Sequence, residues 1–127
     1  MERQKDQDNT KEQRRKPRIE TSNFVGYTIF DLDRKTIDQG TGRTINLSQN
    51  GLLLKTQKAL KGAFVMLMTI DLDGNDVRVE GRLIYSAENP TTGHYLSGVE
   101  FTGSKDKQLQ AIVTFVKAYQ HRKHKKK

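Results

Sequence analysis

The sequence predicts a mainly β protein, a six-stranded antiparallel β-barrel with a C-terminal α-helix. Between residues 22 and 102, runs of β-branched and aromatic residues are separated by short turn-forming segments, a pattern typical of small β-barrels. After residue 103 the spacing of apolar residues changes from about two to about 3.6, which indicates a helix after the last strand.

The first two strands are predicted on either side of an acidic turn. Residues 24–32 are rich in Val, Tyr, Thr, Ile and Phe, which favour strands, and the turn follows at 31–35. Residues 36–45 are predicted as the second strand. We expect Gly40 and Gly42 to loosen it, because glycine has no side chain to pack.

The third and fourth strands are predicted from apolar runs. Residues 52–56 form the third, and Lys61-Gly62 turns the chain into the fourth at residues 64–72, which is expected to be well buried. Asp73-Gly74 is suited to a tight hairpin turn, since glycine tolerates a positive φ.

The last two strands are predicted at residues 77–85 and 95–101, with a loop at 89–93 between them. In the strand at residues 77–85, strict alternation places five residues on one side: Val77, Val79, Gly81, Leu83 and Tyr85.

The helix is predicted from an N-cap and an apolar stripe. Ser104 is a good N-cap, and Asp106 lies in the first turn, where the helix dipole favours a carboxylate. The stripe, widened by Phe115, contains Leu109, Ile112, Val113, Val116 and Tyr119. We expect it to lie across one opening or face of the sheet.

The bulk composition suits one domain. The chain has 127 residues, enough for a core of its own, and no cysteine, which excludes disulfides and thiolate metal sites. With 33% hydrophobic and 30% charged residues it is polar for a globular domain, so part of it is expected to be disordered. There is no apolar run of membrane-span length and no apolar signal-peptide core, so we expect a cytoplasmic protein.

Charge and composition divide the chain into three parts. Residues 1–13 are charged and poor in apolar residues, which predicts a disordered lead. Residues 14–120 are predicted to be the domain, which consists of an arginine segment at 14–18, a barrel at 22–102 and a helix at 104–120. Residues 121–127 form a basic tail with five of the eight excess positive charges. The tail is either a solvated helix end or a contact for nucleic acid, anionic lipid or an acidic partner.

No motif indicates catalysis or metal binding. Residues 71–76 resemble a calcium loop, but the glycine is at the fourth place instead of the sixth, and Arg82 stands where a bidentate glutamate is needed. Residues 40–44 lack the spacing of a phosphate-binding P-loop. The three histidines form no ligand pair on a predicted structured helix. We therefore predict a binding protein, not an enzyme, with no metal and no cofactor.

Two short motifs remain as candidates for a binding site. Arg14 and Arg18 flank Pro17, which favours an extended chain and places both arginines on one face, roughly 13 Å apart. The pair can reach two ends of an elongated anion; the alternative is a cationic linker. The second motif, Asn46-x-Ser48-x-x-Gly51, is by itself an ordinary turn, because Asn and Ser bond nearby backbone.

Together, the two motifs resemble those of the PilZ domain family, the bacterial receptors for cyclic di-GMP. Asn46-x-Ser48-x-x-Gly51 matches that family's Asp/Asn-x-Ser-x-x-Gly and is followed directly by Leu52-Leu53-Leu54. Residues 79–85 and 97–101 resemble the family's last two barrel strands. The resemblance extends from residue 14 to about residue 118 and implies a PilZ-type barrel.

The resemblance implies that the ligand is cyclic di-GMP, a nucleotide with two phosphates and two guanines. Arg14 and Arg18 are expected to hold phosphates and guanine edges, because the guanidinium fork matches both, and Arg15 is expected to assist them. In family members that hold a stacked nucleotide dimer, the residue just before the first motif arginine is often another arginine. Here that residue is Gln13, so one and two bound nucleotides both remain open.

The second motif is implied to form the other side of the nucleotide site. Asn46 is expected to bind a guanine edge, and Ser48 to bond the nucleotide through its hydroxyl. Gly51 is expected to keep the surface open to the flat ligand, and Gly98 to line the site from the last strand.

The implied mechanism is a binding switch. The arginine segment closes over the nucleotide on the barrel surface, and a downstream protein partner binds the new surface. The runner-up is an OB-type barrel that binds single-stranded nucleic acid by stacking bases on exposed aromatic residues. This hypothesis is disfavoured because the aromatic residues that could stack on bases are expected at buried positions, namely Phe64, Tyr85, Phe101 and Phe115. A third hypothesis is a PilZ-like adaptor that has lost the nucleotide.

Overall fold

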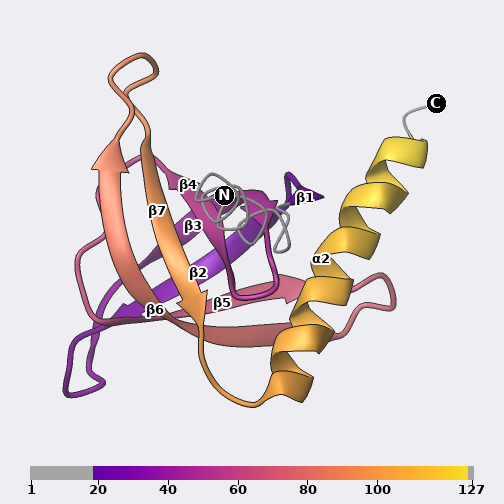
Figure 1. Ribbon diagram of the computed structural model, residues 1–127, viewed down its shortest axis with the longest axis horizontal. Coiled ribbons are helices and arrows are strands. Elements are labelled where there is room, and N and C mark those ends of the chain that lie inside the picture. The colour runs from indigo at the N-terminus through magenta and orange to yellow at the C-terminus, as the bar shows by residue number, and fades with distance from the viewer. Residues whose placement is uncertain (1–18, 126–127) are drawn as a thin grey trace, which may run out of the picture.

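Seven strands and one helix make up the part of the chain that the computed structural model describes, residues 19–125. Figure 1 shows the strands wrapped around a common interior, with the helix beside them. The elements are β1 (Ile19–Glu20), β2 (Phe24–Phe30), β3 (Thr36–Leu47), β4 (Gly51–Thr56), β5 (Phe64–Ile70), β6 (Asp76–Glu88), β7 (Tyr95–Phe101) and α2 (Lys105–Lys125).

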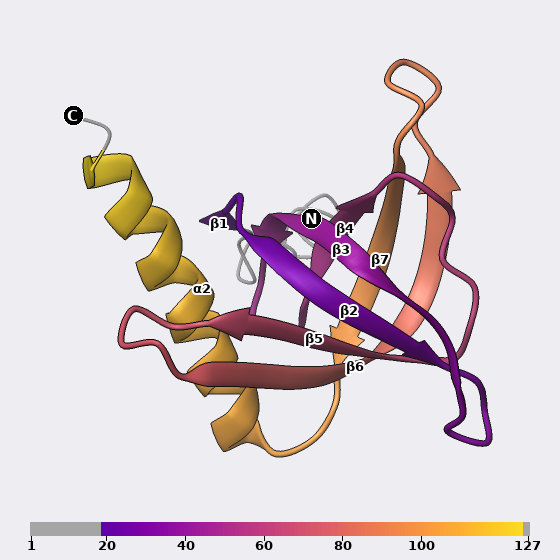
Figure 2. The same ribbon diagram turned by 180° about the vertical axis from the view of Figure 1, so that it is seen from behind.

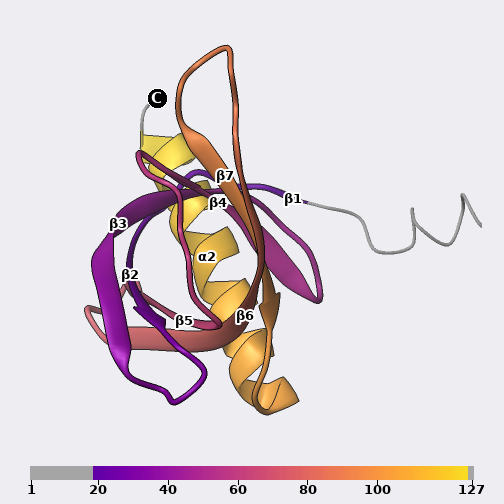
Figure 3. The same cartoon turned by 90° about the vertical axis from the view of Figure 1, so that its left-hand side faces the viewer.

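Six of these strands close into an antiparallel barrel. Their order is β3-β2-β5-β6-β7-β4, and pairing between β4 and β3 completes the ring. At this closure Leu47 lies opposite Leu52, and Arg43 lies opposite Lys55. Figure 2 shows the β2–β5–β6 side of the ring, and Figure 3 looks through it. The predicted six-stranded antiparallel barrel with a C-terminal helix is confirmed.

Strand β1 was not predicted. It has two residues, Ile19 and Glu20, which lie opposite Leu47 and Asn46 at the end of β3. From there the chain continues along β3, where the Thr21 amide donates to the Ile45 carbonyl at 2.9 Å. Two residues are too few to show an alternating pattern, so only the position of β3 decides that they pair.

A β-bulge in β6 changes which face Tyr85 occupies. Leu83 pairs with Val99, but the next pair is Tyr85 with Gly98, so Ile84 is an extra residue on β6. One extra residue reverses every later side chain. Tyr85 is therefore 49% exposed, and the prediction that it shares the inward side of Leu83 is wrong.

The barrel interior is filled by aliphatic side chains from alternate strand positions. Ile29, Leu54 and Val65 are fully buried. Two polar residues of the interior, Thr44 and Ser97, are hydrogen-bonded: the Thr44 hydroxyl lies 3.0 Å from the Thr21 hydroxyl, and the Ser97 hydroxyl donates to Ser86 Oγ at 2.8 Å. Satisfying these groups removes the cost of burying them.

Helix α2 lies across one end of the barrel (Figure 3) and packs on β6. Its N-cap is Ser104 as predicted, since Ser104 Oγ accepts from the Lys107 amide at 3.2 Å. The helix continues to Lys125, beyond its expected end at residue 120. Within residues 19–125 there is no helix long and apolar enough to cross a membrane.

The buried face of α2 differs from the predicted stripe. Ala111 and Phe115 are buried, whereas Leu109 is 60% exposed and Val113 is 41% exposed. The Phe115 carbonyl also accepts from Asn23 Nδ2 at 2.9 Å, which fixes this face against the start of β2. Leu109 and Val113 were wrongly placed in the contact, because the apolar arc of the helix is wider than the barrel end that it covers.

The two glycines of β3 pack closely and do not loosen the strand. A Cβ at Gly40 would lie 2.6 Å from the Tyr27 hydroxyl, and one at Gly42 would lie 2.8 Å from the Lys55 carbonyl oxygen. Both glycines therefore allow close approach of a neighbour.

Candidate functional site

The motif Asn46–Gly51 forms the turn between β3 and β4. The Ser48 amide donates to the Gly51 carbonyl at 2.8 Å, and the Ser48 hydroxyl lies 3.4 Å from the same oxygen. The Asn50 carbonyl accepts from the Phe101 amide at 2.8 Å, which ties the turn to β7. The turn predicted from the Asn and Ser residues is therefore anchored to the neighbouring strand as well as to itself.

Gly51 has a packing requirement that the sequence did not show. A Cβ at this position would lie 2.0 Å from the Val99 carbonyl oxygen, closer than side-chain atoms approach backbone. Gly51 pairs with Glu100 on β7. Its lack of a side chain therefore lets β4 and β7 lie in register at this point, whether or not a ligand is bound.

A shallow pocket of about 310 Å³ lies beside this turn, and we call it the motif pocket. It brings three of the four described site residues together, Ser48 and Gly51 from the turn and Gly98 from β7. The other residues that line it are Asn50, Leu52, Ile84, Tyr85, Val99 and Glu100. Sequence positions far apart thus meet because β4, β7 and β6 are neighbours in the barrel.

Tyr85 is the residue of this pocket that sequence reasoning missed. Its ring lies over Gly98, where a Cβ would fall 2.6 Å from Tyr85 Cε2. An aromatic ring that covers a glycine on the adjacent strand is a known device of β-sheets. The bulge at Ile84 turns Tyr85 outward, and a single inserted residue leaves no sign in the alternation pattern that would locate it.

The border of the motif pocket carries an ion pair. Arg82 Nη2 donates to Glu100 Oε1 at 2.6 Å, and both side chains are about half exposed. Glu100 is itself part of the pocket lining. An anion that enters the pocket would meet this carboxylate, so the pocket needs further cations from elsewhere in the chain to favour a phosphate.

Asn46 does not line the motif pocket. It lies on β3 opposite Leu53 and also opposite Glu20 of β1. The remaining predicted site residues, Arg14, Arg15 and Arg18, lie outside the described residues. The described chain begins at Ile19, which is paired with Leu47 next to the motif turn. The arginine segment therefore directly precedes a strand that is anchored one residue from Ser48.

Hydrogen bonds to Asp71 organise the acidic turn between β5 and β6. Asp71 Oδ1 accepts from the Asp73 amide at 2.9 Å and the Asn75 amide at 2.8 Å, and these bonds, above all that from Asn75, hold the pKa of Asp71 below its ordinary value. Gly74 has a φ of 88°, as the predicted hairpin turn requires. Among residues 19–125 there is no cluster of three His, Asp or Glu side chains suited to a metal ion.

Comparison with known proteins places the chain in a family. The family model of the PilZ domain matches residues 12–118. A comparison with curated proteins gave no match. Among solved structures, the PilZ domain of CeSA from a cellulose-synthesising bacterium is similar at a TM-score of 0.55 with 20% identity, over 80% of this chain and 96% of that one.

Two further solved structures share the fold. One is the inhibitor of motility MotI/DgrA of Bacillus subtilis, with a TM-score of 0.56 and 12% identity over 87% of this chain and 51% of that protein. The other is MrkH of K. pneumonia in complex with c-di-GMP, with a TM-score of 0.54 and 12% identity over 86% of this chain and 55% of that protein. This chain thus spans about half of each of these two proteins.

The family match covers most of the chain and includes the arginine segment, the motif turn, the whole barrel and the packed part of α2. The resemblance seen in the two motifs is therefore confirmed, and the chain belongs to the PilZ domain family.

Proposed function

We propose that this protein is a non-catalytic receptor for cyclic di-GMP, which binds across the motif pocket and the arginine segment. The observation that supports this most is the position of the family motif: its Ser48 and Gly51 line a surface pocket beside the strand that directly follows the arginine segment. In K. pneumonia MrkH, a protein of similar fold, the complex contains c-di-GMP.

The residues have complementary roles in this proposal. Arg14 and Arg18 bind phosphates and guanine edges, with Arg15 assisting, because guanidinium groups donate two parallel hydrogen bonds to either. These cations also outweigh the Glu100 carboxylate at the pocket border. Asn46 and Ser48 bond the nucleotide from the barrel side.

Tyr85, packed over Gly98, supplies a flat surface for the same ligand. The Tyr85 ring is about half exposed and lies over Gly98, so it offers one face to a base. Stacking of a base on an aromatic ring contributes about 1–3 kcal/mol. Gly51 contributes differently, by holding β4 against β7 and so shaping the pocket wall.

The arginine segment then closes over the bound nucleotide, and the reshaped surface is bound by a downstream protein partner. Ligand-driven ordering of a segment is an established type of switch. The partner is expected to contact both the segment and the strand ends around the pocket, because only the complex joins them.

Calorimetric titration with cyclic di-GMP tests the proposal. We expect micromolar or tighter binding to cyclic di-GMP, with GMP and a single-stranded oligonucleotide much weaker. Arg14→Ala should abolish binding, and Tyr85→Ala should weaken it about tenfold or more, in line with the loss of one stacked base. The molar ratio decides whether one nucleotide or two bind, the question that Gln13 leaves open.

The matched control is Arg78→Ala, which removes an exposed arginine of β6 that does not line the motif pocket. It should bind cyclic di-GMP like the unaltered protein. Absence of cyclic di-GMP binding in the unaltered, folded protein would reject the receptor proposal and favour the nucleotide-free adaptor. Tighter, salt-dependent binding of the oligonucleotide would instead favour a nucleic-acid-binding barrel.

A further inference from the structure

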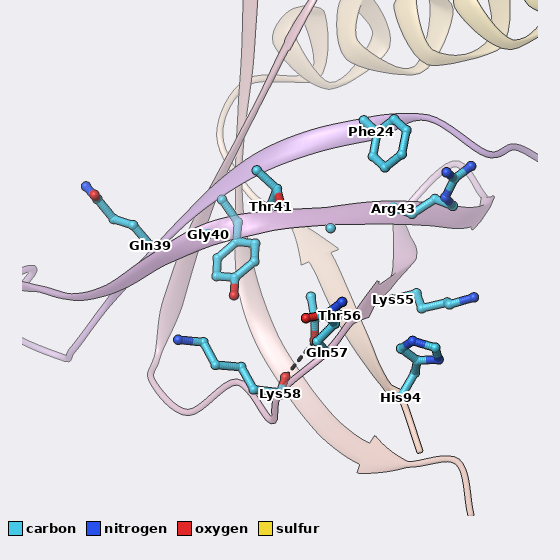
Figure 4. A pocket seen from close by; sticks show the side chains of 12 residues that line it. Phe24, Gln39, Gly40, Thr41, Arg43, Lys55, Thr56, Gln57, Lys58 and His94 are labelled. Atoms are coloured by element: carbon cyan, nitrogen blue, oxygen red, sulfur yellow. Dashed lines mark hydrogen bonds between the residues drawn. The ribbon is translucent and has the colours of Figure 1, made fainter. Parts of the chain in front are cut away.

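A cleft of about 610 Å³, twice the volume of the motif pocket, opens between β3 and the end of β4 (Figure 4). Its lining comes from β2, from residues 39–43 of β3, from residues 55–58 and from His94 before β7. None of these residues lines the motif pocket. Its volume is within the range of small-molecule sites, roughly 300–1,000 Å³.

Two glycines of β3 let neighbouring groups pack closely along one wall of the cleft. Gly40 and Gly42 both line it, and a Cβ on either would collide with a neighbour. The Tyr27 ring lies against Gly40 and also lines the cleft. Burial raises the pKa of the Tyr27 hydroxyl above its ordinary value, which favours the neutral phenol, a hydrogen-bond donor.

The lining of the cleft is cationic. It contains Arg43, Lys55 and Lys58 together with His94, and no Asp or Glu lines it within the described residues. Lys58 Nζ donates to Asp38 Oδ1 at 2.9 Å, which holds Lys58 at one end of the cleft. Arg43 lies toward the other end, with Lys55 and His94 near it (Figure 4). His94 Nδ1 is buried and has no hydrogen-bond partner among the described residues.

A planar shelf adjoins these cations. The Arg43 guanidinium lies over the Phe24 ring, 4.1 Å from its centroid, and Arg43 Nη1 donates to Ser22 Oγ at 2.6 Å. The hydrogen bond and the ring hold the guanidinium in a fixed orientation. Phe24 is 70% exposed and Arg43 is half-buried, so this stacked pair presents a planar surface to a base.

From these features we propose that the cleft is a second ligand site, distinct from the motif pocket, that binds a nucleoside di- or triphosphate. The base stacks on the Phe24–Arg43 shelf. The phosphates lie between Lys55 and Lys58. Arg43 and Lys55 add two positive charges to that of Lys58, which the Asp38 carboxylate offsets, and this excess of positive charge matches a ligand with several negative charges better than a monophosphate.

Titration of the full chain with sodium ATP, in magnesium-free buffer and followed by amide chemical shifts, tests the proposal. We expect saturable shifts at Gly40, Gly42 and His94, with no comparable shifts at residues 48–51. Lys55→Gln and Lys58→Gln should each weaken ATP binding about tenfold, as expected for loss of a charge-assisted contact. Lys58 is 60% exposed, so its variant should fold.

Two control variants distinguish binding in the cleft from general charge attraction and from binding in the motif pocket. Lys61→Gln removes an exposed lysine that does not line the cleft and should leave ATP affinity unchanged. Ser48→Ala should retain ATP binding even though it weakens cyclic di-GMP binding, so the two sites can fail independently. Tripolyphosphate, which lacks a base, should bind at least tenfold more weakly than ATP.

Three results would overturn the proposal. The first is an absence of saturable shifts with millimolar ATP. The second is a set of ATP shifts centred on residues 48–51, which would place the nucleotide in the motif pocket. The third is tripolyphosphate binding as tightly as ATP, or an equal loss of affinity in Lys61→Gln, since either would show general attraction between a basic protein and an anion.

Discussion

Gly51 shows how one residue of a binding motif also serves the fold. The position of its missing side chain is occupied by the Val99 carbonyl of β7, so this glycine stabilises the barrel independently of any ligand. The same applies to Gly98, whose surface is covered by Tyr85. A glycine in such a motif therefore cannot be assigned to ligand contact from its identity alone.

Gly51→Ala should destabilise the protein by roughly 1–3 kcal/mol, the usual range for forcing an extra methyl group into a packed site. Denaturant unfolding monitored by circular dichroism measures it. Gly26→Ala is the matched control on β2, because a Cβ there would lie 3.7 Å from Met68 Cε, an ordinary contact. Equal stability of the two variants would contradict the close approach of β4 and β7.

Asp71 should give the hairpin between β5 and β6 an acid-dependent stability. Its pKa lies below the ordinary value of 3.8, mainly because of the hydrogen bond from the Asn75 amide. A carboxyl whose pKa is lower in the folded state stabilises that state above its unfolded pKa, and the contribution is lost as the pH falls through the folded pKa.

The measurement is unfolding free energy as a function of pH below about 5, for the unaltered protein and for Asp71→Asn. The variant keeps an oxygen acceptor but cannot titrate, so its stability should fall less steeply with acid. Parallel curves for the two proteins would show that the Asp71 carboxyl is not held by the turn.

At the scale of elements, helix α2 is positioned by a narrower contact than its apolar pattern suggests. Phe115 and Ala111 face the barrel, while Leu109 and Val113 lie on the exposed side. The barrel end can cover only part of the helix circumference, and the Asn23 side chain, bonded to the Phe115 carbonyl, selects which part. Periodicity identifies a helix but not the width of its contact.

Phe115→Ala should therefore cost about 3–5 kcal/mol of stability, and Leu109→Ala less than about 1 kcal/mol. Thermal or denaturant unfolding of the two variants tests this assignment. Comparable losses of stability in the two variants would mean that the helix packs on the barrel through its Leu109 face. The wider predicted stripe also allows that arrangement.

At the scale of the whole molecule, the proposed nucleotide site joins segments that are distant in sequence. The motif turn, the β6 bulge and β7 form one surface because β4 pairs with β7 and β7 pairs with β6. The arginine segment is attached directly to β1, beside the motif turn. Closing that segment over a nucleotide would connect the two ends of the site without a change in the barrel.

Amide relaxation of residues 14–18 tests this closure. Saturating cyclic di-GMP should raise the order of the segment's backbone amides, while those of the barrel core, such as Leu54 and Val65, stay unchanged because their packing is complete without ligand. Unchanged relaxation of the segment at full occupancy would refute the closure, even if the nucleotide binds elsewhere on the barrel.

The number of barrel strands, the N-cap at Ser104 and the motif turn could all be predicted from the amino-acid sequence. These features depend on local chemistry: alternation of apolar residues, side-chain caps, and the turn preferences of Asn, Ser and Gly. Family membership also followed from the sequence, because the two motifs keep their order and spacing.

Which faces meet could be learned only from the folded chain. The bulge at Ile84 turned Tyr85 outward, the pairing of β4 with β7 placed Gly98 beside the motif turn, and the limited contact area left Leu109 exposed. The cationic cleft joins residues that are separate in the sequence, from Phe24 to His94. Such contacts depend on strand register and packing between distant segments, and neither is encoded in the local pattern of a single strand or helix.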